Sequence, residues 1–217
     1  MKPHLAQVLN TLAHEIRTPL AVSQGYLKLF LDGRLTDADD TRRAMEQTRQ
    51  ALGALSTYCM DMGKISALAE GNDNAGIPER VTTADLISRL RGHADLADTT
   101  WNGDAGAGAI DARPARDVVD AIAIVLKSAF DEAKGQPQDV RTDVASSLTL
   151  LAGHADALSA LQTGPAGPAS RALNFGKGGK GLKLIWAAFV LDRHGVETWT
   201  IQDHKSSVGI RIPLVTA

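Results

Sequence analysis

The chain has 217 residues, a length that suits one large domain or two small ones. Apolar residues make up 44% of the sequence, which is enough for a buried core and excludes wholesale disorder. The formal net charge of −2 argues against nucleic acid and anionic membrane surfaces as partners. Cys59 is the one cysteine, so an internal disulfide is excluded and a cytoplasmic location is favoured.

Membrane insertion and metal binding are not predicted either. The most apolar run, "LIWAAFVL", is too short to cross a bilayer, and the N-terminal stretch "MKPHLAQVLN" lacks the apolar core of a signal peptide. No group of histidine and cysteine residues has the spacing of metal ligands. We therefore expect a cytoplasmic protein with no direct membrane insertion and no metal site.

The first predicted element is a long helix from about residue 3 to residue 30. Its apolar residues recur at intervals of three and four, the spacing of a helix that buries one face. These residues are Leu5, Val8, Leu9, Leu12, Ile16, Leu20, Leu27 and Phe30. After the helix breaker Gly33, a second long helix is predicted to begin at an N-cap, Thr36 or Asp37, and to end near residue 70. Its inner face carries Met45, Leu52, Leu55, Met62, Ile65 and Leu68.

Two long helices joined by a short turn form a helical hairpin. A hairpin on its own cannot bury both of these apolar stripes. Pairing with a second copy of the chain would bury them in a four-helix bundle. The pattern therefore predicts a homodimer.

A change of composition follows the hairpin. The stretch "AEGNDNAGIPERV" is rich in residues that break helices, so residues 71–79 are predicted to link a first domain, 1–70, to a second domain, 80–217. In the second domain, helices are predicted in "TTADLISRLRGHA", "ARPARDVVDAIAIVLKSAFDEAKG" and "GLKLIWAAFVLDRHG". Strands are predicted in "TTWNGDAGAGAID" (two, around a glycine turn), "DVRTDVASSLTLLAG" (a pair) and "ETWTIQDHKSSVGIRIPLV" (a hairpin), and "TGPAGPASRALNFGKGG" is predicted to be a loop. This mixture predicts an α/β sandwich, and an α+β fold class for the chain.

The most specific motif is "HEIRTPL", His14 to Leu20. It resembles the H-box of two-component sensor histidine kinases, and the hairpin resembles the dimerisation and histidine-phosphotransfer domain of that family. The resemblance implies that His14 accepts a phosphoryl group. The chemistry suits that role, because an imidazole is partly neutral at cellular pH and a neutral ring nitrogen can attack phosphorus.

The neighbours of His14 complete the expected site. The resemblance implies that Glu15 accepts the other ring N–H of the histidine, which would make the attacking nitrogen more basic. Thr18 lies one turn further on, and the resemblance implies that it assists hydrolysis of the partner's aspartyl phosphate. Arg17 offers a positive charge to an acidic receiver pocket. Pro19 removes a backbone hydrogen bond inside the helix and is expected to bend the helix beside His14.

Residues 80–217 resemble the ATP-binding domain that follows this hairpin in sensor kinases and belongs to the gyrase and Hsp90 class. Gly178, Gly179 and Gly181 match its last glycine box, where backbone N–H groups would approach phosphates at a helix N-terminus. Three departures are present. Ser128 stands where the family has a magnesium-binding asparagine, Lys183 replaces a glycine, and "LAGHADAL" lacks the aspartate that receives the adenine amino group. The nucleotide site is therefore predicted to be degenerate.

The sequence thus predicts a histidine phosphotransferase that passes a phosphoryl group through His14 to and from the aspartates of response-regulator receiver domains. No cofactor of its own is predicted: Mg would come with the receiver domain, and ATP would bind only if the degenerate site still functions. One alternative is the catalytic core of an ATP-dependent sensor kinase with a divergent nucleotide site. Another is a non-catalytic dimeric scaffold that binds a receiver domain.

Overall fold

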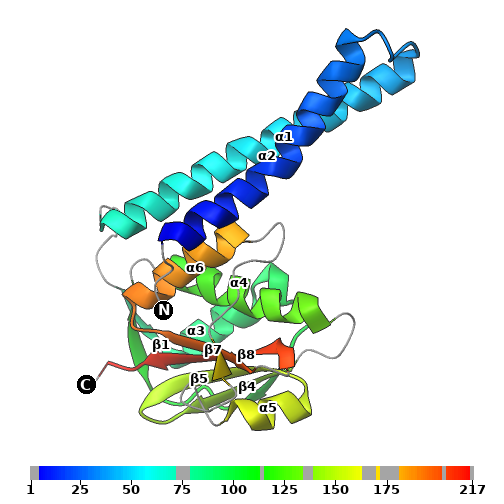
Figure 1. Ribbon diagram of the computed structural model, residues 1–217. Helices are drawn as coiled ribbons and strands as arrows, with labels where there is room; N and C mark the ends of the chain where they lie inside the picture. The colour runs from blue at the N-terminus through cyan, green and yellow to red at the C-terminus, as the bar shows by residue number, and fades with distance from the viewer. Residues whose placement is uncertain are drawn as a thin grey trace.

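The computed structural model describes residues 5–71, 79–112, 115–133, 139–162, 170–171, 181–201 and 204–215. A helical hairpin stands on a domain of mixed helices and strands (Figure 1). The predicted α+β fold class is confirmed. Most of the predicted linker, residues 72–78, lies outside the described residues, as do most of the predicted glycine- and proline-rich loop and the glycines Gly178 and Gly179.

The hairpin consists of helix α1, Leu5–Leu31, and helix α2, Ala38–Glu70. The turn between them contains Gly33 with φ 65°, a left-handed conformation that glycine adopts without steric cost. Asp37 is the N-cap of α2, because its carboxylate accepts a hydrogen bond from the Asp40 N–H at 3.4 Å. Of the two predicted caps, Asp37 is therefore the one used.

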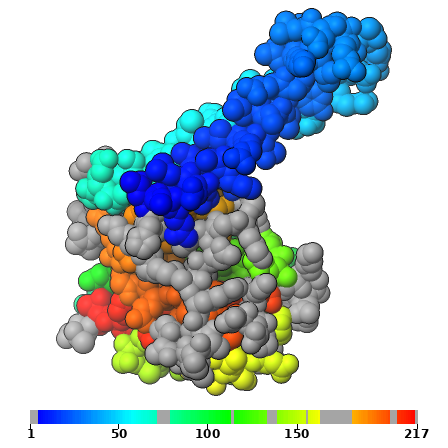
Figure 2. Space-filling model, in the orientation of Figure 1, coloured from blue at the N-terminus to red at the C-terminus, as the bar shows by residue number. Residues whose placement is uncertain are grey.

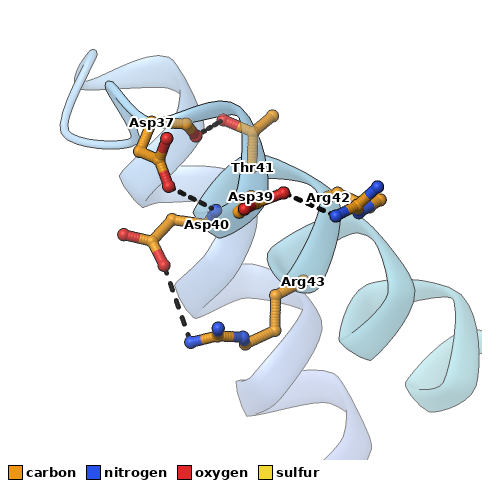
Figure 3. A network of polar contacts seen from close by, with 6 residues as sticks. All are labelled: Asp37, Asp39, Asp40, Thr41, Arg42 and Arg43. Atoms are coloured by element: carbon orange, nitrogen blue, oxygen red, sulfur yellow. Dashed lines mark hydrogen bonds and ion pairs between the residues drawn. The ribbon is translucent and has the colours of Figure 1, made fainter.

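Charged side chains surround the first turns of α2 (Figure 3). The guanidinium of Arg42 contacts Asp39, and that of Arg43 lies 3.6 Å from Asp40. All four side chains are more than half exposed to solvent. Pairs of this kind contribute little to stability, because water and salt screen them.

The distal half of the hairpin stands clear of the rest of the molecule (Figure 2). Several residues of the predicted inner faces are exposed in the single chain: Leu20, Leu27, Phe30, Met45 and Leu52. At the other end of the hairpin, Val8 and Ile65 are only 5% and 3% exposed and belong to the same hydrophobic cluster as the core of the α/β domain. One end of the hairpin is thus packed, while the other presents apolar side chains that this chain leaves uncovered.

The α/β domain is built on a six-stranded sheet with the order β2-β4-β5-β8-β7-β6. Its strands are β2 (Thr100–Gly103), β4 (Asp139–Val144), β5 (Ser147–Gly153), β6 (Ser170–Arg171), β7 (Glu197–Ile201) and β8 (His204–Pro213). β2 and β4 are parallel, and the other neighbours are antiparallel. A separate two-stranded sheet pairs β1, Glu79–Thr82, with β3, Ala109–Ala112.

Helices cover both sides of the large sheet. On one side lies α4, Ala115–Ala133, with α6, Gly181–Arg193, packed beside it and in contact with the hairpin (Figure 1). On the other side the short helix α5, Ala155–Leu161, packs against β5, β7 and β8. The remaining helical elements are α3, Thr83–Arg91, and the 3-10 turn η1, Ala94–Leu96.

The predicted strand pair and the predicted C-terminal hairpin are confirmed as β4–β5 and β7–β8. The two strands around the glycine turn exist, but they do not pair with each other: β2 joins β4 and β3 joins β1. Segments distant in the sequence supply their hydrogen-bonding partners. The elements β1, η1, α5 and β6 were not predicted, because each is short and carries little periodicity.

Candidate functional site

His14 lies on the exposed side of α1, in the half of the hairpin nearer the α/β domain. Arg17 and Thr18 are exposed as well, and their spacing of three and four residues from His14 places all three side chains over one surface of the helix. Within the described part of the chain, the His14 ring has no hydrogen-bond or ion-pair partner. Its nitrogens are therefore open to a reaction partner that approaches from solvent.

Glu15 faces the opposite way. Its side chain is buried, with 6% of the residue exposed, and its Oε1 accepts a hydrogen bond from the backbone N–H of Gly181 at 3.4 Å. Gly181 is the first residue of α6. The carboxylate is turned toward α6 in this arrangement, so the expectation that Glu15 accepts the ring N–H of His14 stays a prediction.

Pro19 is buried on the same side of α1 as Glu15. The two residues are four positions apart, one helical turn, and the helix continues past the proline to Leu31. The expectation that Pro19 contributes to a partner-binding surface is therefore not met in this arrangement, because its ring is covered. Arg17, by contrast, is available to a partner.

Tyr58 of α2 is a member of the site that sequence reasoning missed. Burial, the negative charge of Glu15 and a hydrogen bond to Glu15 together raise the pKa of the Tyr58 hydroxyl above its ordinary value of 10.0, burial being the largest cause. No local motif marks this tyrosine. Its position beside Glu15 depends on how α1 and α2 are aligned in the hairpin, which the sequence does not spell out.

A cleft of about 890 Å³ lies between α2, the η1 turn, α4 and the first turns of α6. Ser128 and Ile124 of α4 and Lys183 of α6 line it. The structure thus places two of the predicted departures from the nucleotide-binding pattern, Ser128 and Lys183, in one cavity. The hydroxyl of Ser128 stands on the wall where the family resemblance puts an asparagine side chain.

His93 also lines the cleft, and its surroundings explain it as a structural residue. Its Nδ1 accepts a hydrogen bond from the Asp95 N–H at 3.2 Å, so the histidine caps the η1 turn. Its Nε2 lies 3.5 Å from Oδ1 of Asp120, and Nε of Arg116 lies 3.6 Å from Oδ2 of the same carboxylate. Both ring nitrogens are engaged, which leaves neither free to accept a phosphoryl group.

Metal centres and membrane spans are both absent from the described residues. No set of three or more histidine, cysteine, aspartate and glutamate side chains in that part of the chain is arranged to hold a metal ion. Among the described helices, none combines the length and the apolar character needed to cross a membrane.

Comparisons with known proteins agree with this geometry. Residues 4–66 match the model of the His Kinase A (phospho-acceptor) domain family. The histidine kinase AdeS of Acinetobacter baumannii is structurally similar, with a TM-score of 0.55 and 15% identity over 94% of this chain and 98% of that one. The histidine kinase ThkA, solved in complex with the response regulator protein TrrA, has a TM-score of 0.55 and 14% identity over 94% of this chain and 60% of that one. No curated protein matches the sequence.

The hairpin therefore matches the phospho-acceptor domain of histidine kinases, and the chain as a whole shares its fold with the histidine kinase AdeS. The resemblance inferred from "HEIRTPL" is confirmed at this level. Identities of about 15% establish the common fold and leave the details of the reaction to the residues of this chain.

Proposed function

We propose that the protein is a histidine phosphotransferase that exchanges a phosphoryl group between His14 and the aspartates of response-regulator receiver domains. The observation that carries this proposal is the exposure of His14, unpartnered among the described residues, on a helix that matches a phospho-acceptor domain. The similar kinase ThkA was solved with a response regulator, which supports a receiver domain as the partner class here.

In the proposed reaction, a ring nitrogen of His14 forms a bond to phosphorus while the bond from phosphorus to the aspartate oxygen breaks. The receiver carboxylate leaves, and the reverse step returns the phosphoryl group to an aspartate. Such transfers depend mostly on positioning and on stabilising charge, so an exposed imidazole on a docking helix is sufficient nucleophilic machinery. Arg17 lies on the same surface and would face the negative charge of the receiver site, while Thr18 would orient water for hydrolysis.

The cleft bears on the source of the phosphoryl group. At the position where the family resemblance puts its magnesium-binding side chain, α4 offers a short hydroxyl at Ser128, and Ile124 offers a hydrocarbon. Four aspartates also line the cleft, Asp61, Asp95, Asp117 and Asp120, but within the described residues no three such side chains are arranged to hold a metal ion. These observations support a phosphorylated receiver as donor, and the magnesium ion would arrive with that receiver.

The test is a transfer assay with two donors. The full-length protein is incubated with a panel of radiolabelled phosphorylated receiver domains and, separately, with radiolabelled ATP and magnesium. We expect label from a receiver in the wild type and in the control His154→Gln, which removes a histidine that makes no side-chain cap bond, and no label in His14→Gln. Label from ATP that disappears in His14→Gln would instead establish the kinase alternative, and label from neither donor would favour the non-catalytic scaffold.

A further inference from the structure

Glu15 is a buried carboxylate at the junction of three helices. Its side chain comes from α1, its hydrogen-bond donor Gly181 begins α6, and Tyr58 contacts it from α2. Within the described residues no lysine or arginine pairs with it. A buried carboxylate without a cationic partner is costly unless hydrogen bonds compensate for the lost water, so this contact calls for an explanation.

We propose that Glu15 is a latch that closes the hairpin onto the α/β domain and, while closed, is withdrawn from the phosphoacceptor His14. The inference rests on the proposed function for its consequence at His14, but the latch itself is a contact between the two domains. The contact bridges residues 166 positions apart in the sequence, so it reports directly on how the hairpin and the domain are arranged.

The electrostatics of α6 favour this use of the glutamate. The first N–H groups of a helix have no partner inside the helix, and the N-terminus carries a partial positive charge. The first turn of α6 contains no acidic residue that would satisfy it. The carboxylate of Glu15 therefore supplies from α1 the negative charge that the sequence of α6 lacks.

Tyr58 of α2 lies near the carboxylate. After burial, the charge of Glu15 contributes to the raised pKa of the Tyr58 hydroxyl, and the residue packs against the main hydrophobic cluster. Glu15 is thus placed between α2 and α6, with the Gly181 N–H as its hydrogen-bond donor. Gly181 and Tyr58 can be changed separately, which allows the latch to be tested without changing Glu15 itself.

The latch has a consequence for the adjacent histidine. While the Glu15 carboxylate is held by the Gly181 N–H, it cannot accept the ring N–H of His14, and the imidazole lacks the partner that would orient it. Opening of the hairpin releases the carboxylate. The closed arrangement is then the less reactive one, and movement of the hairpin away from α6 activates His14.

Opening can be measured by the labelling rate of a buried thiol. In a Cys59→Ser background, Ile65→Cys places the thiol where the hairpin packs on the domain, and Ala121→Cys places one in the 0%-exposed core of the domain as a reference. Gly181→Pro deletes the N–H that Glu15 accepts, at a first helical position where proline is well tolerated, while Gly181→Ala retains the N–H. Tyr58→Phe removes the hydroxyl near Glu15.

We expect the thiol at position 65 to be labelled about tenfold faster in Gly181→Pro than in Gly181→Ala, the effect of a lost hydrogen bond to a charged group. The thiol at position 65 should also be labelled faster in Tyr58→Phe than in the protein that keeps Tyr58. The reference thiol at position 121 should react at an unchanged rate. Equal rates at position 65 for Gly181→Pro and Gly181→Ala would overturn the latch. Faster labelling at both positions would also overturn it, because it would indicate general loosening.

The consequence at His14 is measured with the same variants and a phosphorylated receiver. Transfer to His14 should be faster in Gly181→Pro than in Gly181→Ala, in proportion to the thiol rates. Faster thiol labelling with unchanged transfer would refute the link between the latch and His14. If no variant and no wild-type protein accepts label, the proposed function fails, while the thiol measurement still decides the latch.

Discussion

Replacing Gly209 by alanine tests how tightly the sheet of the α/β domain is packed. Gly209 in β8 lies directly opposite Trp199 in β7, and a methyl group at position 209 would come within 2.1 Å of Cε2 and 2.2 Å of Cζ2 of the indole. Trp199 is 2% exposed, and its Nε1 donates a hydrogen bond to the Leu161 carbonyl of α5 at 3.2 Å. The ring therefore cannot move without disturbing the contact between the sheet and α5.

The expected cost follows from these contacts. Overpacking a buried site costs about 1–3 kcal/mol, and loss of the indole hydrogen bond adds about 1 kcal/mol, so Gly209→Ala should lower the free energy of unfolding by about 2–4 kcal/mol. Urea unfolding followed by circular dichroism measures the change, and the emission of Trp199 should shift as its environment alters.

Gly63→Ala is the matched control, because it adds the same methyl group in the interior of α2 with no atom within 4 Å. There alanine should raise stability by about 0.5–1 kcal/mol through its helix preference. A Gly209→Ala protein within about 0.5 kcal/mol of wild type, the range typical of surface substitutions, would refute the packing argument.

Three further outcomes are expected. Titration of the tyrosine absorbance should show Tyr58 ionising above its ordinary pKa of 10.0, and Glu15→Gln should lower that pKa. The folded state then holds the Tyr58 proton more tightly than the unfolded state does. The contribution of Tyr58 to the free energy of unfolding is therefore complete below pH 10.0 and is lost as pH rises through the raised pKa. An unchanged pH dependence of stability in Tyr58→Phe would contradict this. Glu46, whose pKa is lowered to about 2 chiefly by a hydrogen bond from Arg49, should return toward 4.5 in Arg49→Gln when followed by NMR. Leu126→Ala, at a 0% exposed position of α4, should cost about 2–5 kcal/mol in denaturant unfolding, and a smaller loss would mean that the core refills the cavity.

The periodic spacing of apolar residues predicted most of the secondary structure. The two hairpin helices and the apolar α4 were predictable because each repeats its apolar spacing over many turns, and β4–β5 because two alternating runs flank a short turn. Pairing was not predictable where the partner is remote. β2 and β3 flank a glycine turn in the sequence, yet each finds its hydrogen bonds with a different distant strand.

The candidate site shows the same division. "HEIRTPL" identified His14, and helical spacing placed Arg17 and Thr18 beside it on the exposed surface. The direction of Glu15 was missed because it depends on the packing of α6 against α1. Tyr58 and Gly181 were beyond reach as its partners, because the packing of α2 and α6 around α1 determines that contact.

By itself, the sequence marked His14 as the candidate phosphoacceptor, because motif and helical period are local properties of the chain. The tertiary structure decided what the neighbouring carboxylate does. Glu15 belongs to the reactive motif by sequence, but it lies at the N-terminus of α6 because burial of one face of α1 turns it toward the domain, where an unsatisfied N–H attracts it.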